Sequence, residues 1–260
     1  MLSISYVRVF ALCKRYLATF FHLGQVQDLF FWPSFDIFIW GMAGSWMQRG
    51  DHHLVPIFLT AIVLWQCAWR NSYEISMGLM EEIWNRNLVN LFATPIKLSE
   101  WVLAVMLMGI LKMLITATFA WGFICLLYDY NVLNMGWFFL PHAFLLILSG
   151  WTIGFIATSC IIAMGNRGYV FTWMIPYAFI PFSGVYYPAD ILPVWAQHLS
   201  KFLPMTYIFA SARSFFLQGT MLWENLITAF GLSCLYLPLA LLLFVYTFKR
   251  ARTRGLARLE

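Results

Sequence analysis

The chain has 260 residues, of which 62% are hydrophobic and only 10% are charged, and it carries a formal net charge of +5. An ordinary soluble domain has roughly 25% charged residues, so this composition excludes a soluble globular enzyme and indicates a protein whose solvent is mostly lipid. Because a spanning helix takes about 20 apolar residues, the length allows about six or seven spans and no sizeable domain outside the membrane.

The N-terminal half begins with an amphipathic segment and then alternates apolar runs with one polar helix. Residues 3–24 place apolar side chains at helical spacing, with basic residues elsewhere on the wheel, which predicts an interfacial helix. Spans are predicted at 29–48 and 54–78. Residues 81–95 are amphipathic, too polar to span and closed by Pro95, so they predict a separate cytoplasmic helix.

The C-terminal half adds four spans and one irregular segment. Spans are predicted at 101–127, 137–164, 168–185 and 225–248. Between the last two, prolines interrupt apolar stretches that are too short to cross a membrane, and we expect short external or re-entrant helices over 188–213. The fold class is therefore an all-α membrane protein with six transmembrane helices.

The basic residues indicate that both termini are cytoplasmic, because Lys and Arg gather on the cytoplasmic side of membrane proteins. This orientation leaves only Arg49, Lys201 and Arg213 outside. It places twelve basic residues at the inner face: Arg8, Lys14, Arg15, Arg70, Arg86, Lys97, Arg167, Lys249, Arg250, Arg252, Arg254 and Arg258.

The sequence contains no recognisable catalytic centre. The histidines are dispersed, no hydrolase, metalloprotease or P-loop motif occurs, and the cysteines lack metal-ligand spacing. The adjacent Asp51, His52 and His53 are poorly arranged for a closed metal site, and we expect no metal. The basic charge does not indicate nucleic-acid binding. If ATP drives transport, ATP and Mg²⁺ bind to another chain, and this chain holds no cofactor.

Four charged residues in or beside the apolar spans need an explanation, because an unpaired charge in a bilayer is costly. Counting helical rise places Asp36 at a depth similar to those of Arg70 and Lys112, so a structural ion pair is the favoured interpretation and a polar translocation path is the alternative. Arg70 and Glu74 are also spaced for local pairing on one helix.

Aromatic residues form 19% of the chain. Interfacial belts are expected to contain Trp32, Trp46, Trp101, Trp137 and Trp223. Packing or lipid contact is favoured for the tryptophans inside the spans, with sugar stacking or apolar substrate binding as the alternative: Trp40, Trp65, Trp69, Trp121, Trp151 and Trp173. Gly150 and Gly154 form a GxxxG pattern typical of close helix contacts.

Two segments together resemble the ABC-2 type permeases of ATP-driven exporters. Residues 81–104 are similar to the family's acidic, leucine-rich stretch that ends in a turn with proline. Residues 182–213 are similar to its external motif run, with matching positions at Phe182, Ser183, Gly184, Pro188, Pro193, Trp195, Pro204 and Tyr207.

The resemblance implies a homodimer, or a pseudo-dimer with a related permease, bound to two copies of a cytoplasmic ABC ATPase in a bacterial inner membrane. The ATPase-coupling helix would be 81–95, with contacts expected from Glu81, Glu82, Trp84, Arg86, Asn87, Leu91 and Pro95. The motif residues of 182–213 would form an external gate.

The resemblance also implies export of an amphipathic substrate. A lipid-linked saccharide or polysaccharide is slightly favoured, and drug or lipid efflux is the close alternative. A membrane-embedded enzyme or a channel is a remote alternative, since a clustered acid, base or metal site at one depth is not evident.

Overall fold

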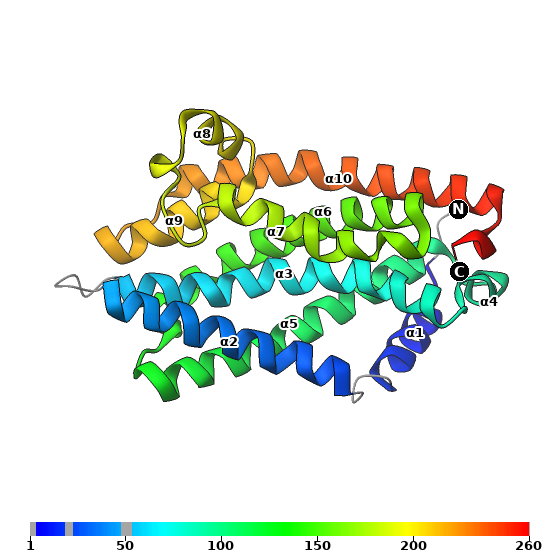
Figure 1. Cartoon of the computed structure of the whole chain (residues 1–260), viewed down its shortest axis with the longest axis horizontal. Coiled ribbons are helices and arrows are strands. Elements are labelled where there is room, and N and C mark those ends of the chain that lie inside the picture. The colour runs from blue at the N-terminus through cyan, green and yellow to red at the C-terminus, as the bar shows by residue number, and fades with distance from the viewer. Residues whose placement is uncertain (1–3, 19–22, 48–53, 260) are drawn as a thin grey trace.

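The computed structural model describes residues 4–18, 23–47 and 54–259, which are almost entirely helical and contain no strand (Figure 1). The longer helices are α2 (Leu23–Met47), α3 (Leu54–Trp84), α5 (Leu98–Tyr128), α6 (Phe139–Met164) and α10 (Trp223–Arg254). The shorter helices are α1 (Tyr6–Ala18), α4 (Leu88–Ala93), α7 (Phe171–Ser183), α8 (Val194–Ser200) and α9 (Pro204–Gln218). Four 3₁₀ turns also occur in the described residues: η1 (Val132–Phe138), η2 (Gly165–Val170), η3 (Ala189–Ile191) and η4 (Leu256–Arg258).

Helix α3 forms the centre of the bundle and packs against α2, α5, α6 and α7 (Figure 1). Almost every residue from Ile57 to Ile83 is buried. By contrast, α10 presents a largely exposed apolar surface to its surroundings, as expected of a helix that faces lipid. A helix that is apolar and enclosed by its neighbours is a core element, so displacement of α3 must involve the helices around it.

The two ends of the bundle differ in structure. Helices α1 and α4 and the C-terminal end of α10 lie at one end, and α8 and α9 lie at the other (Figure 1). The chain turns at Gly165, whose φ is +67°, and α7 returns beside α6. This arrangement brings both terminal regions of the chain to the same end of the bundle.

Length and composition identify four candidate membrane spans in the described residues. These are α3, α5, α10 and the segment 132–183, which contains both α6 and α7. The predicted span 168–185 is shorter in the structure, since α7 has 13 residues. The 3₁₀ turn η2 occupies the first residues of that range, and Gly184 ends α7 with a φ of +66°.

The predicted separate helix over 81–95 is wrong in its extent. Helix α3 continues to Trp84, so Glu81 and Glu82 belong to its last turn. Arg86 then adopts a φ of +50°, a conformation that interrupts a right-handed helix, and α4 contains only six residues. The segment is therefore a helix end, a tight turn and a short helix.

The GxxxG pattern on α6 packs against α3 of the same chain. A Cβ atom at Gly150 would collide with the Ala68 carbonyl oxygen, and one at Gly154 would lie 2.9 Å from the Ser72 carbonyl oxygen. The absence of side chains lets the two backbones approach closely. Gly122 on α5 has no heavy atom within 4 Å of the corresponding Cβ position.

We expect Gly150→Ala to destabilise the chain by about 1–3 kcal/mol, because the added methyl group pushes α6 away from α3. Thermal unfolding in detergent, followed by tryptophan fluorescence, measures this as a lower melting temperature. Gly122→Ala is the matched control and should leave the melting temperature unchanged or raise it slightly, because alanine favours helix over glycine. Equal effects of the two substitutions would contradict the packing role of Gly150.

Candidate functional site

The end of α3 carries a buried carboxylate, that of Glu82, which is 1% exposed. Its two oxygens accept hydrogen bonds from Arg15 Nη2, each at 2.8 Å, and one also accepts from Tyr16 Oη at 3.0 Å. Asn87, just after the turn, donates its side-chain N–H to the other oxygen. One acidic side chain therefore joins α1, the end of α3 and the start of α4.

The protonation states of the partners suit this network. Burial and the negative charge of Glu82 raise the pKa of the Tyr16 phenol, so its hydroxyl stays protonated and donates. Burial opposes the charge on Arg15, but the hydrogen bonds and charge of Glu82 outweigh it and raise the pKa of the guanidinium. The buried carboxylate is therefore matched by a permanent cation.

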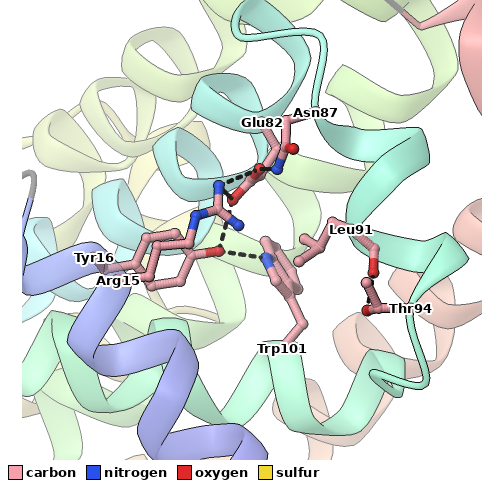
Figure 2. A network of polar contacts seen from close by, with 7 residues as sticks. All are labelled: Arg15, Tyr16, Glu82, Asn87, Leu91, Thr94 and Trp101. Atoms are coloured by element: carbon pink, nitrogen blue, oxygen red, sulfur yellow. Dashed lines mark hydrogen bonds and ion pairs between the residues drawn. The ribbon is translucent and has the colours of Figure 1, made fainter.

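Helix α5 joins the same network through Trp101, which is 0% exposed and donates its indole N–H to Tyr16 Oη at 3.0 Å (Figure 2). Trp101 is thus not the interfacial belt residue that its position near a span end predicted. The set Arg15, Tyr16, Glu82, Asn87 and Trp101 is called the clamp below. It connects α1, α3, α5 and the α3–α4 turn.

A second group of polar contacts lies beside the clamp and holds the start of α1 to the start of α5. The buried carboxylate of Glu100 accepts hydrogen bonds from the backbone N–H groups of Ser5 and Lys97, both at 2.9 Å. Arg8 lies 3.6 Å from Glu100 and also donates to the Pro95 carbonyl oxygen. Arg15, Tyr16, Glu100 and Trp101 were not predicted as site residues; the basic face of the N-terminal helix was the only signal for any of them.

The predicted coupling residues separate into buried and exposed groups. Glu82 and Leu91 are buried, and Glu81 and Asn87 are half-buried. Trp84, Arg86 and Pro95 are exposed, as are Asn85 and Asn90 between them. Trp84 donates its indole N–H to Asn166 Oδ1 at 2.8 Å. Thr94 Oγ1 donates to the Leu91 carbonyl oxygen at 2.6 Å and so closes the end of α4, as the positions of these two residues in Figure 2 show. The exposed residues from Trp84 to Asn90 are called the coupling turn.

The intramembrane charges are paired differently from the sequence-based expectation. Lys112 Nζ lies 2.6 Å from Glu74 Oε1, and both side chains are buried. Arg70 donates to the backbone oxygen of Asp28 instead of forming an ion pair with Glu74. The favoured pairing of Asp36 is therefore not the one found in the described residues, where Glu74 is the carboxylate that binds Lys112. Helical rise measures only depth, and depth does not fix which face of a helix a side chain occupies.

Aromatic side chains from α3 and α7 form a cluster. The ring of Trp69 lies 4.9 Å from that of Tyr177 and 5.3 Å from that of Trp173. Trp69 is buried, whereas Tyr177 is 48% exposed. Asp36 lies within electrostatic range of the Tyr177 hydroxyl. The cluster therefore presents an aromatic surface on α7 that feels the charge of a carboxylate on α2.

The predicted gate residues lie together at the opposite end of the bundle. Phe182 and Trp195 make an edge contact with ring centroids 6.0 Å apart, and Thr206 Oγ1 donates to the Phe182 carbonyl oxygen at 3.1 Å. Gly184, in the left-handed conformation, accepts a 2.7 Å hydrogen bond from Arg213, a residue that sequence reasoning did not select.

The remaining motif residues belong to the same group of short helices, η3, α8 and α9, which is called the cap below. Pro188, Pro193 and Pro204 precede or start η3, α8 and α9 in turn, where a missing N–H costs nothing. Ser183 is the last residue of α7, and Tyr207 donates to the Lys201 carbonyl oxygen at 3.0 Å.

No group of three metal-ligating side chains is found in the part of the chain that the structure describes. Asp51, His52 and His53 lie outside the described residues.

The helical bundle, with its candidate spans and its polar turn at one end, defines a multi-pass membrane protein. The family model for the ABC-2 type transporter matches residues 9–217, and the chain belongs to this family. This confirms the resemblance that the two sequence segments indicated. Membership makes the chain a membrane permease of an ABC transporter and implies association with an ABC ATPase. No match was found among curated proteins.

We expect Glu82→Gln to loosen α1 by about 1–3 kcal/mol, because Arg15 loses its counter-ion and the buried network loses charge-assisted hydrogen bonds. This free-energy cost is smaller than that of breaking a fully buried ion pair, because the Arg15 side chain is 43% exposed and solvent screens its charge. Amide hydrogen exchange over residues 6–18 should be about tenfold faster in the variant. The control Lys14→Gln removes an exposed charge from the same helix and should change exchange less than twofold. Unchanged exchange in Glu82→Gln would show that the clamp does not hold α1.

Proposed function

We propose that this chain is the permease subunit of an ABC exporter in a bacterial inner membrane, in which two copies of the chain associate with two copies of a separate ATPase. The six longitudinal helices α2, α3, α5, α6, α7 and α10 are the proposed spans, and both termini are cytoplasmic. The basic residues near the end that carries α1 and α4 support this orientation, because cytoplasmic ends are enriched in Lys and Arg.

The observation that carries the proposal is the placement of the coupling turn. It is exposed, yet it continues directly from α3, the most enclosed helix of the bundle. The clamp holds the start of the turn in place, because Arg15, Tyr16 and Asn87 all donate hydrogen bonds to Glu82. A partner that binds the turn can therefore transmit its movement to the centre of the bundle and not merely to a loose surface loop.

In the proposed mechanism the exposed turn docks to the ATPase and the clamp transmits the force. Glu82 takes no direct part in docking, because its oxygens are already engaged within the chain. ATP binding draws the two ATPase subunits together, and the rigid turn moves α3 with respect to α2 and α7. A change in access across the membrane then needs only that ATP favours one arrangement by a few kcal/mol.

For the substrate we propose an amphipathic molecule with a saccharide part. The aromatic surface of Trp173 and Tyr177, with Asp36 in electrostatic range of Tyr177, supports this class, because aromatic faces and a carboxylate together suit a sugar ring and its hydroxyl groups. Drug or lipid efflux is the second candidate. It is supported by the apolar cavity of about 380 Å³ between α6, α7, α9 and α10, which is lined by residues including Ile153, Phe179, Met205 and Leu239.

The test is to co-express the chain with the ABC ATPase encoded beside it and to measure assembly and ATP turnover in nanodiscs. We expect a stable complex that hydrolyses ATP. Asn90→Trp places a bulky ring on the exposed face of α4 and should lower complex formation or turnover by about tenfold. Lys14→Trp, on the exposed face of the interfacial helix, is the control and should have little effect, because tryptophan is favoured at the interface.

Failure of the ATPase to bind, or equal behaviour of the two variants, would contradict the docking role. In the active complex, faster ATP turnover with a lipid-linked oligosaccharide than with an apolar drug supports the saccharide class. The reverse order favours the efflux candidate.

A further inference from the structure

A basic cavity of about 360 Å³ lies between the end of α6, the end of α10 and the turn η4. Its lining includes Arg250, Arg254 and Arg258, all exposed, together with the apolar side chain of Ile162 and the ring of Tyr246. Among the described residues, no acidic side chain lines the cavity and none of these arginines forms an ion pair. Three cations therefore face one hollow without a counter-ion from the described part of the chain.

The cavity lies where the apolar surface of α10 ends, which corresponds to the level of the membrane surface. Arg250 and Arg254 lie on α10 one turn apart, and Tyr246 lies one turn before them on the same face. The preceding turns of that helix expose Leu239, Leu242 and Leu243. The cations thus follow directly after the apolar surface of a spanning helix, where a tyrosine typically marks the level of the lipid headgroups.

We propose that this cavity binds the phosphate group of an anionic phospholipid. The arginines supply planar N–H donors that match phosphate oxygens, and Tyr246 with the leucines before it supplies an apolar surface for the acyl chains. Basic pockets beside spanning helices are suited to this class of ligand. A free phosphate ion shares the charge but would leave the apolar part of the site without a ligand.

Binding at this site also bears on the coupling turn. Leu256 and Leu259, which flank Arg258, are buried in the same core cluster as Leu88 and Leu91 of α4. Turn η4 packs directly on α4. A headgroup held by Arg254 and Arg258 would fix the C-terminal segment against α4, so anionic lipid would stabilise the position of the coupling turn.

The test uses the full chain purified in a neutral detergent and titrated with phosphatidylglycerol, with bound lipids counted by native mass spectrometry. Phosphatidylcholine, whose choline cation balances its phosphate so that the lipid has no net charge, is the control lipid. We expect saturable binding of phosphatidylglycerol, and the double variant R250Q/R254Q should weaken it by about tenfold or more. The matched control R252Q combined with K249Q removes two charges from the same helix outside the cavity lining and should retain affinity within about twofold.

Three results would overturn the proposal. Equal loss in the two double variants would indicate diffuse attraction to the basic tail. Displacement of phosphatidylglycerol by millimolar inorganic phosphate, with no preference for the lipid, would indicate a free-anion site. Unchanged lipid binding combined with loss of ATPase binding in R250Q/R254Q would assign the arginines to the protein partner. Melting temperatures in lipid-free detergent show whether each variant is folded, so a loss of binding cannot be mistaken for unfolding.

Discussion

The rest of the structure depends on one buried carboxylate at the end of the central helix. Glu82 lies where α3 leaves the core, and an unpaired charge there would be strongly destabilising. Arg15 and Tyr16 satisfy it from α1, and Asn87 satisfies it from beyond the turn. Because all these groups bind one side chain, α1, α3 and the coupling turn are held in a single arrangement. Trp101 extends the arrangement to α5.

This constraint gives a physical route from the end of the bundle that carries α1 and α4 to its interior. Gly150 and Gly154 let α3 and α6 pack backbone to backbone, and the Glu74–Lys112 pair joins α3 to α5 in the interior. Closely packed helices of this kind move together and do not deform independently. A force applied at the coupling turn would therefore reach the aromatic cluster on α7, which packs against α3 at Trp69. The proposed lipid site would add a second support, because η4 packs on α4.

The sequence predicted the helical class and the approximate places of the long helices, because runs of apolar residues are a strong signal. The resemblance at 182–213 also located a segment that the structure folds into one cap, with Phe182 against Trp195. The break at Arg86 was missed, since a positive φ at a non-glycine residue has no clear sequence signal. The partners of Glu82 were missed because Arg15 lies 67 residues away, and helical periodicity gives the faces of a helix but not their neighbours. For the same reason the depth of Asp36, close to those of Arg70 and Lys112, did not identify Glu74 as the partner of Lys112.

The most direct measurement of the central claim is site-specific photocrosslinking from Asn90 in the complex with the ATPase. The account predicts a crosslink between this position and the ATPase, and a clearly lower yield when Glu82→Gln removes the counter-ion of Arg15 and loosens the turn. A crosslinker at Trp195, at the opposite end of the bundle, should give no product. Absence of a crosslink from Asn90 in a complex that hydrolyses ATP, or a yield that Glu82→Gln leaves unchanged, would contradict the claim that the clamp positions the coupling turn for the ATPase.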